Sequence, residues 1–265
     1  MSFQPVVPLG GYAGWTFLTR TLEAQSAAFS AAPLNERDTA YFRQNISTIS
    51  SAADLVEDFQ LLRVALGAFG LQEDQPNRAF IRTILDEGTS DNAALANRLA
   101  DKRYRAFSEA FGFGESTPPK TQQAGFADRI LARFERQEFE RAVGEQDDSM
   151  RLALNLQREL PELAARGLTA DTNWLSILGS PPLREVFETA LGLPEGFGLI
   201  DLDQQVEQIR SRARVVLGTD DVATLARADQ TDGVLRNFFG RAQIEGLTGA
   251  ATPAAIALTL LQEIA

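Results

Sequence analysis

The chain contains no cysteine and no histidine among its 265 residues. Disulfides, thiolate nucleophiles, imidazole bases and the usual zinc ligands are therefore excluded together. Its lysines are only Lys102 and Lys120, which leaves little room for Schiff-base or Ser-Lys chemistry. These absences predict a protein that is not an enzyme, and we expect no metal and no cofactor.

Positive charge is also scarce, because 25 basic residues face 36 acidic ones and the net charge is −11. Nucleic acids and anionic membrane surfaces select basic proteins, so we expect neither as a partner. The longest apolar run, residues 254–261, is interrupted by Thr259 and is far shorter than the roughly 20 residues that cross a bilayer. We therefore expect no membrane insertion. Residues 1–15 lack basic side chains and a sustained apolar core, which argues against a general secretory signal.

The composition favours helix over sheet, with 38 alanines and 11 valines. Apolar residues at positions 55, 59, 62, 66 and 69 predict one amphipathic helix, which starts near Ser51 and Asp54 and ends at Gly70. A second such helix is predicted from Asp201 to Gly218. No segment alternates with period two, so we expect an all-α, multihelical fold.

Capping residues and apolar spacing place the remaining helices. They are expected at about 14–29 and 36–46, from Asn77, over about 90–112, from about 126, from Asp148, from Ser180, and from Thr252 through Ile264. The clearest loop is 114–123, which contains Pro118 and Pro119.

Two stretches of the sequence resemble each other, and similar segments flank them in the same order. Residues 88–96 (GTSDNAALA) resemble residues 218–226 (GTDDVATLA), and similar segments flank both. We therefore predict two related helical units, at about 52–114 and 180–240, from an internal duplication. The alternative is that Gly-Thr-x-Asp is a helix stop followed by a helix start, which unrelated helical hairpins share. For domains, we expect a flexible N-terminal arm over 1–14 and a single multihelical domain over 15–265.

Two groups of residues are candidates for contact with a ligand or partner. Arg98, Lys102 and Arg105 stand at i, i+4 and i+7, so on one helix they would form a basic face for an anion or an acidic partner. The plain alternative is a solvated helix surface. Trp15 and Phe17 are candidate partner contacts, together with the apolar C-terminal segment.

Three segments carry a family resemblance. They are residues 40–46 (AYFRQNI), residues 54–71 with LGAFGL at their end, and residues 96–114 (ANRLADKRYRAFSEAFGFG). Over 36–114 the chain resembles a bacterial, all-helical domain family of unknown function found in alphaproteobacteria. Genes of that family often lie among flagellar genes, so the resemblance implies a link to the flagellum. It implies no catalytic residue.

The leading hypothesis is a non-enzymatic helical protein that binds another protein, linked to flagellar assembly and located in the cytoplasm or exported with the flagellum. The alternative is a carboxylate-dependent hydrolase or a small-ligand binder with a site between the two helical units. The sequence leaves the oligomeric state and the identity of the partner open.

Overall fold

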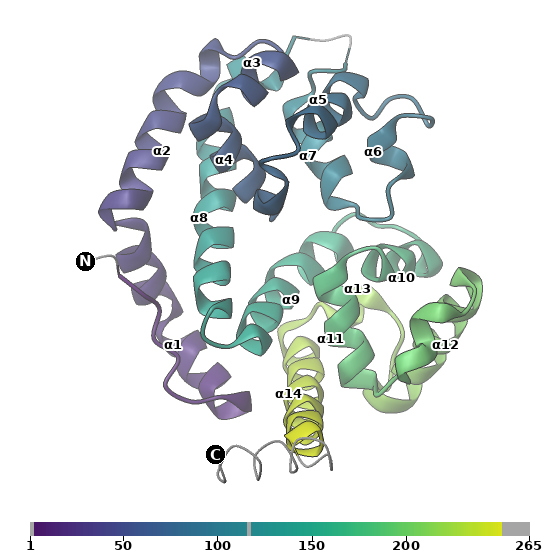
Figure 1. Ribbon diagram of the computed structural model, residues 1–265. Coiled ribbons are helices and arrows are strands. Elements are labelled where there is room, and N and C mark those ends of the chain that lie inside the picture. Colours follow the sequence, from purple (N-terminus) through teal and green to yellow (C-terminus); the bar gives the residue numbers. More distant parts are fainter. Residues whose placement is uncertain (1–2, 116–117, 251–265) are drawn as a thin grey trace, which may run out of the picture. The chain divides into compact units, whose positions relative to one another are not determined.

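The computed structural model describes residues 3–115 and 118–250, and over these residues the chain forms α-helices and short 3-10 turns without any strand. The prediction of an all-α fold is confirmed (Figure 1). Among these described helices none combines the length and the apolar character that a membrane span requires. The predicted helix from Thr252 lies outside the described residues.

The chain folds into two compact units. Over the described residues, unit 1 contains residues 3–6, 18–115 and 118–146, and unit 2 contains residues 7–17 and 147–250. The boundary falls inside the first helix, α1 (Gly11–Ser30), between Phe17 and Leu18. Unit 2 is therefore built from two separate stretches of the chain.

Unit 1 is assembled around one hydrophobic core. Phe69, Phe107, Phe111 and Phe126 are buried there, and the rings of Phe111 and Phe126 meet edge to face at a centroid distance of 5.3 Å. Beside its part of α1, the unit contains α2 (Pro33–Asn45), α3 (Ala52–Glu57), α4 (Phe59–Gly67), α5 (Arg78–Glu87), α6 (Leu95–Arg98), α7 (Arg103–Phe111) and α8 (Phe126–Gly144), with 3-10 turns η1 (Ile46–Thr48), η2 (Gln72–Asp74) and η3 (Lys120–Gln122).

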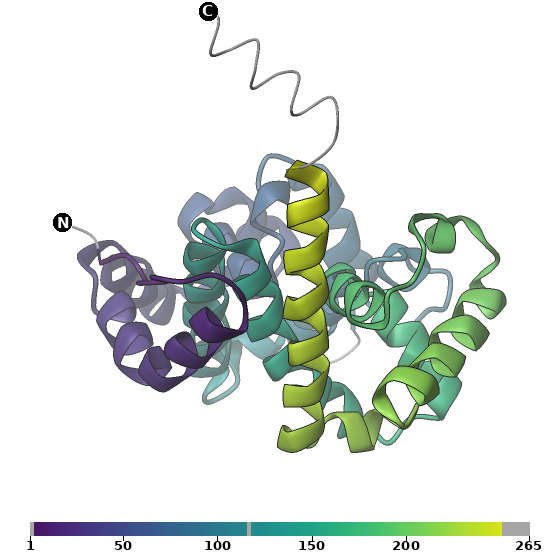
Figure 2. The ribbon, with the colours of Figure 1, turned by 90° about the horizontal axis from the view of Figure 1, so that it is seen from below.

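Unit 2 is built on α11 (Pro181–Leu191), which packs against both α9 (Asp148–Ala164) and α14 (Ala228–Ala250). Figure 2 shows α14, in yellow, as one long continuous helix. The N-terminal stretch of the chain completes this unit, because the Trp15 ring lies on Phe239 and the Tyr12 hydroxyl donates a hydrogen bond to Asp232. The unit also contains α10 (Ala170–Leu178), α12 (Leu202–Leu217), α13 (Val222–Leu225) and the 3-10 turn η4 (Glu195–Leu199).

The single helix predicted from Ser51 to Gly70 is wrong, because the chain breaks at Asp58. The predicted start is confirmed: Ser51 and Asp54 form a capping box. Asp58 adopts an extended conformation, and its side chain accepts hydrogen bonds from the amides of Gln60 and Leu61, so it caps a new helix instead of continuing the old one. As a result Phe59, expected to face inward, is 59% exposed.

The single helix predicted over about 90–112 is also wrong. It is two helices, α6 and α7, separated by extended backbone at Leu99. Asp101 supplies the local reason, since its carboxylate accepts a hydrogen bond from the Arg103 amide and pairs with the Arg103 guanidinium at 2.7 Å. A short acidic side chain that binds nearby amides favours a helix start over a helix interior.

Two further differences concern unit 2. Helix α14 continues past residue 240, where the second predicted unit ends, to Ala250. Helix α10 was not predicted at all.

At the N-terminus, α1 begins at Gly11, and Val6 is hydrogen-bonded through its amide and carbonyl to the Gln25 side chain. The flexible arm over 1–14 and the single domain over 15–265 stay predictions.

Candidate functional site

The predicted basic face is not one helix face. Arg98 is the last residue of α6, Lys102 precedes α7, and Arg105 lies on α7, so the spacing that would align them is interrupted. All three side chains are exposed. The Lys102 ammonium donates a hydrogen bond to the Leu99 carbonyl at 2.8 Å. This bond provides a partner for a backbone carbonyl at the end of α6. An anion or partner contact at these residues stays a prediction.

The two candidate aromatic contacts have different surroundings. Trp15 is only 4% exposed, and its ring lies 6.1 Å from that of Phe239, so it is a core side chain of unit 2. Phe17, two residues later, is 37% exposed. Of the two, only Phe17 offers surface to a partner.

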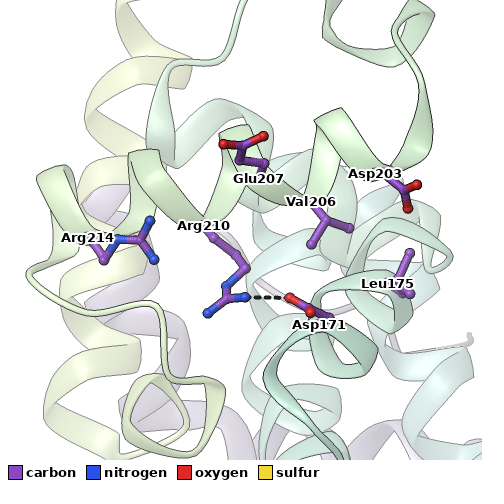
Figure 3. Close-up of a pocket in the computed structure, with 7 residues that line it drawn as sticks. All are labelled: Asp171, Leu175, Asp203, Val206, Glu207, Arg210 and Arg214. Atoms are coloured by element: carbon purple, nitrogen blue, oxygen red, sulfur yellow. Dashed lines mark hydrogen bonds and ion pairs between the residues drawn. The ribbon is translucent and has the colours of Figure 1, made fainter.

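A groove of about 410 Å³ opens between α10 and α12 within unit 2 (Figure 3). We call it the α10–α12 groove. Helix α10 contributes two side chains and helix α12 contributes the others; the lining residues are Asp171, Leu175, Asp203, Val206, Glu207, Arg210 and Arg214. The groove is open to solvent and combines charged side chains with an aliphatic floor.

The basic side chains of the groove are held by aspartates. Arg210 pairs with Asp171 across the groove, as Figure 3 shows, and with Asp220 at 2.8 Å. Arg214 pairs with the same Asp220 carboxylate at 2.7 Å. The hydrogen bond with Asp220 raises the pKa of Arg210 above its ordinary value. Both arginines therefore have their charge compensated within the unit.

Local sequence explains why these groups meet. Thr169 caps α10 through the Thr172 amide, and the buried Trp174 indole donates a hydrogen bond to the Asp220 carbonyl at 2.8 Å. Helix α12 ends at Gly218, whose φ of +78° lets the chain turn sharply without a side-chain penalty. Because of this turn, the Asp220 carboxylate lies beside Arg210 and Arg214 of the preceding helix α12.

The acidic side chains that line the groove from α12 differ from these arginines, because they lack an ion-pair partner in the described part of the chain. Asp203 and Glu207 are exposed, and within the described part of the chain they make no hydrogen bond or ion pair. Beside them Val206 is 8% exposed and Leu175 is 37% exposed. The groove therefore presents uncompensated negative charge next to aliphatic surface.

This arrangement suits binding better than acid–base chemistry. A general acid at neutral pH needs a carboxyl group sheltered from water, and both unpaired carboxylates of the groove face solvent. In residues 3–115 and 118–250, no cluster of three or more metal-ligating side chains occurs.

Sequence reasoning overlooked the groove, although a signal was present. Asp203, Glu207, Arg210 and Arg214 follow a 4-3-4 spacing, the same spacing that was used to find apolar helix faces. Here it aligns a charged stripe. The other wall was missed because α10 was missed, despite Thr169 as a cap followed by apolar residues at 174, 177 and 178.

Comparison with known proteins places the chain in a family. A family model described as "Protein of unknown function (DUF1217)" matches residues 68–229. The chain belongs to the DUF1217 family. The predicted resemblance to a family of unknown function is thereby confirmed. Every lining residue of the groove lies within the part that matches the DUF1217 model.

The DUF1217 fold also occurs in a solved structure. A crystal structure of a protein from Agrobacterium tumefaciens, an alphaproteobacterium, determined by a structural genomics consortium, is similar with a TM-score of 0.74 and 24% identity. The similarity covers 91% of this chain and 99% of that one, and it establishes the fold alone. No curated protein matches the chain.

Proposed function

We propose that this DUF1217 protein is a non-enzymatic helical protein that binds another protein, and that it acts in assembly of the flagellum. The observation that carries the binding role is the exposed aliphatic surface beside the α10–α12 groove. Leu175, which lines the groove, is 37% exposed, and Leu202, at the start of α12, is 52% exposed. Large aliphatic side chains grouped at a groove are typical of protein interaction sites.

The flagellar part of the proposal rests on the sequence resemblance, whose family genes often lie among flagellar genes. The protein acts in the cytoplasm or is exported with the flagellum. The non-enzymatic part rests on the missing cysteine and histidine and on the solvent-exposed carboxylates of the groove.

The proposal includes the internal duplication. Between residues 52 and 114, helices α3, α4 and α5 are followed by the short α6 and then α7. Around the second predicted unit, 180–240, α10 lies just before its start and is followed by α11 and α12, the short α13 and then α14, which continues past residue 240. Helix α3 packs against α4 and α5, as α10 packs against α11 and α12. This shared order supports two copies of one helical unit.

Deletion of the gene, scored by swimming, tests the function directly. We expect the deletion to impair motility and the reintroduced gene to restore it. Affinity capture with the full chain as bait should recover a flagellar protein. Normal swimming together with capture of no flagellar protein would overturn the proposal.

A further inference from the structure

We infer that the α10–α12 groove binds a partner segment that carries a lysine or arginine next to an aliphatic side chain. The inference rests on the proposed protein-binding function and names the chemistry of what is bound. It is argued from the charges of the groove and from the aliphatic side chains on its two helices.

The two arginines of the groove are already neutralised by aspartates. Arg210 is paired with Asp171 and Asp220, and Arg214 is paired with Asp220. Asp203 and Glu207, one helical turn apart on α12, are exposed and have no polar partner among the described residues. The charge left for a ligand is therefore negative, and a cationic group complements it.

The aliphatic surface indicates a protein segment in preference to a bare cation. Leu202 lies one turn before Val206 on α12, and Val206 lines the groove together with Leu175 on the facing helix. Leu202 is 52% exposed and Leu175 is 37% exposed. Contact with aliphatic side chains removes this surface from water, which a metal ion or a simple amine cannot do.

The chain's own C-terminal residues do not fit this groove. Residues 251–265 supply aliphatic side chains, but their one charged side chain is Glu263, and they contain no lysine or arginine. Their charge has the same sign as that of Asp203 and Glu207, so they would be repelled.

A peptide-binding experiment with the full chain tests the inference. The probe is a short fluorescein-labelled amphipathic peptide of leucine and lysine, followed by fluorescence anisotropy at physiological salt. The groove variant combines Asp203→Asn with Glu207→Gln, which keeps shape and removes charge. A matched control combines Glu23→Gln with Glu36→Gln, which removes two exposed, unpaired carboxylates from unit 1.

We expect the groove variant to weaken binding about fivefold or more, since it removes two exposed charge contacts and each is worth roughly two- to fivefold. Leu202→Ser should also weaken it, and the control pair should change affinity less than about twofold. A peptide with serine in place of leucine should bind much more weakly. All variants should keep the helical circular dichroism of the parent chain.

Three results would overturn the inference. The first is equal loss of affinity in the control pair, which would indicate non-specific attraction to an acidic protein. The second is no binding of the leucine–lysine peptide. The third is self-association of the parent chain in sedimentation that the groove variant abolishes, which would make a second copy the occupant. If affinity capture still recovers a flagellar partner with the groove variant, this inference fails while the proposed function stands.

Discussion

Gly114 illustrates how a single side chain can be excluded by backbone contact. It lies against Gly88 so closely that a methyl group at position 114 would stand 2.6 Å from the Asp86 carbonyl oxygen and from the Gly88 Cα. Backbone atoms cannot rotate away as a flexible side chain can. Gly233, inside α14, has no neighbour within 4 Å of the corresponding position.

Substitution of these two glycines should therefore have opposite effects. Gly114→Ala should destabilise the protein by about 1–3 kcal/mol, because the two loop segments must separate. Gly233→Ala should stabilise it by about 0.5–1 kcal/mol, because alanine loses less conformational freedom in a helix. Thermal unfolding followed by circular dichroism measures both changes. Equal effects of the same sign would contradict the close approach at Gly114.

The predicted helix ends were correct where residues next to the helix end determine it. The helix ending at Gly218 and the capping box at Ser51 were predicted correctly, because both depend only on neighbouring residues. The apolar stripe from position 55 to position 69 identified the buried face except at Phe59, because periodicity does not register a break at a single aspartate such as Asp58. Periodicity measures which face is buried, whereas helix ends depend on one or two hydrogen bonds.

The candidate site was predicted poorly for a related reason. Its walls come from α10 and α12, which are separated by α11, and no local pattern states that they pack together. The Asp203 to Arg214 stripe was visible in the sequence, but only the fold reveals that its arginines are neutralised and its first two carboxylates are not.

The cap of α13 gives a prediction at the element scale. Asp221 accepts hydrogen bonds from the Thr224 hydroxyl and the Thr224 amide, and these bonds lower the pKa of its carboxyl below the ordinary 3.8. A lowered pKa in the folded state means that the stabilisation is present at neutral pH and is lost as the pH falls through the folded value. Asp221→Ala should cost about 1 kcal/mol at neutral pH.

Asp221→Asn separates the cap from its charge. Asparagine caps helices about as well as aspartate, so this variant should keep most of the stability at neutral pH and lose only the part of its pH dependence that Asp221 contributes. Urea unfolding followed by tryptophan fluorescence at several pH values measures both effects, since Trp174 lies in the same unit. A loss in Asp221→Asn as large as that in Asp221→Ala would contradict the capping role.

The whole molecule carries an excess of negative charge, which governs its long-range encounters. The net charge of −11 repels polyanions and attracts cationic partners, and salt screens both effects. We expect no measurable binding to duplex DNA or to vesicles containing phosphatidylglycerol, even at low salt. A gel-shift assay and vesicle flotation test this, and salt-dependent binding in either would contradict it.

Assembly of unit 2 from both ends of the chain has a consequence for synthesis. Residues 7–17 are translated long before Met150, Asp232 and Phe239, which they contact in the folded unit. The contact between the Trp15 indole and Phe239 can form only after that delay. Unit 2 of the nascent protein can therefore be completed only after Phe239 has been translated, more than 200 residues after Trp15.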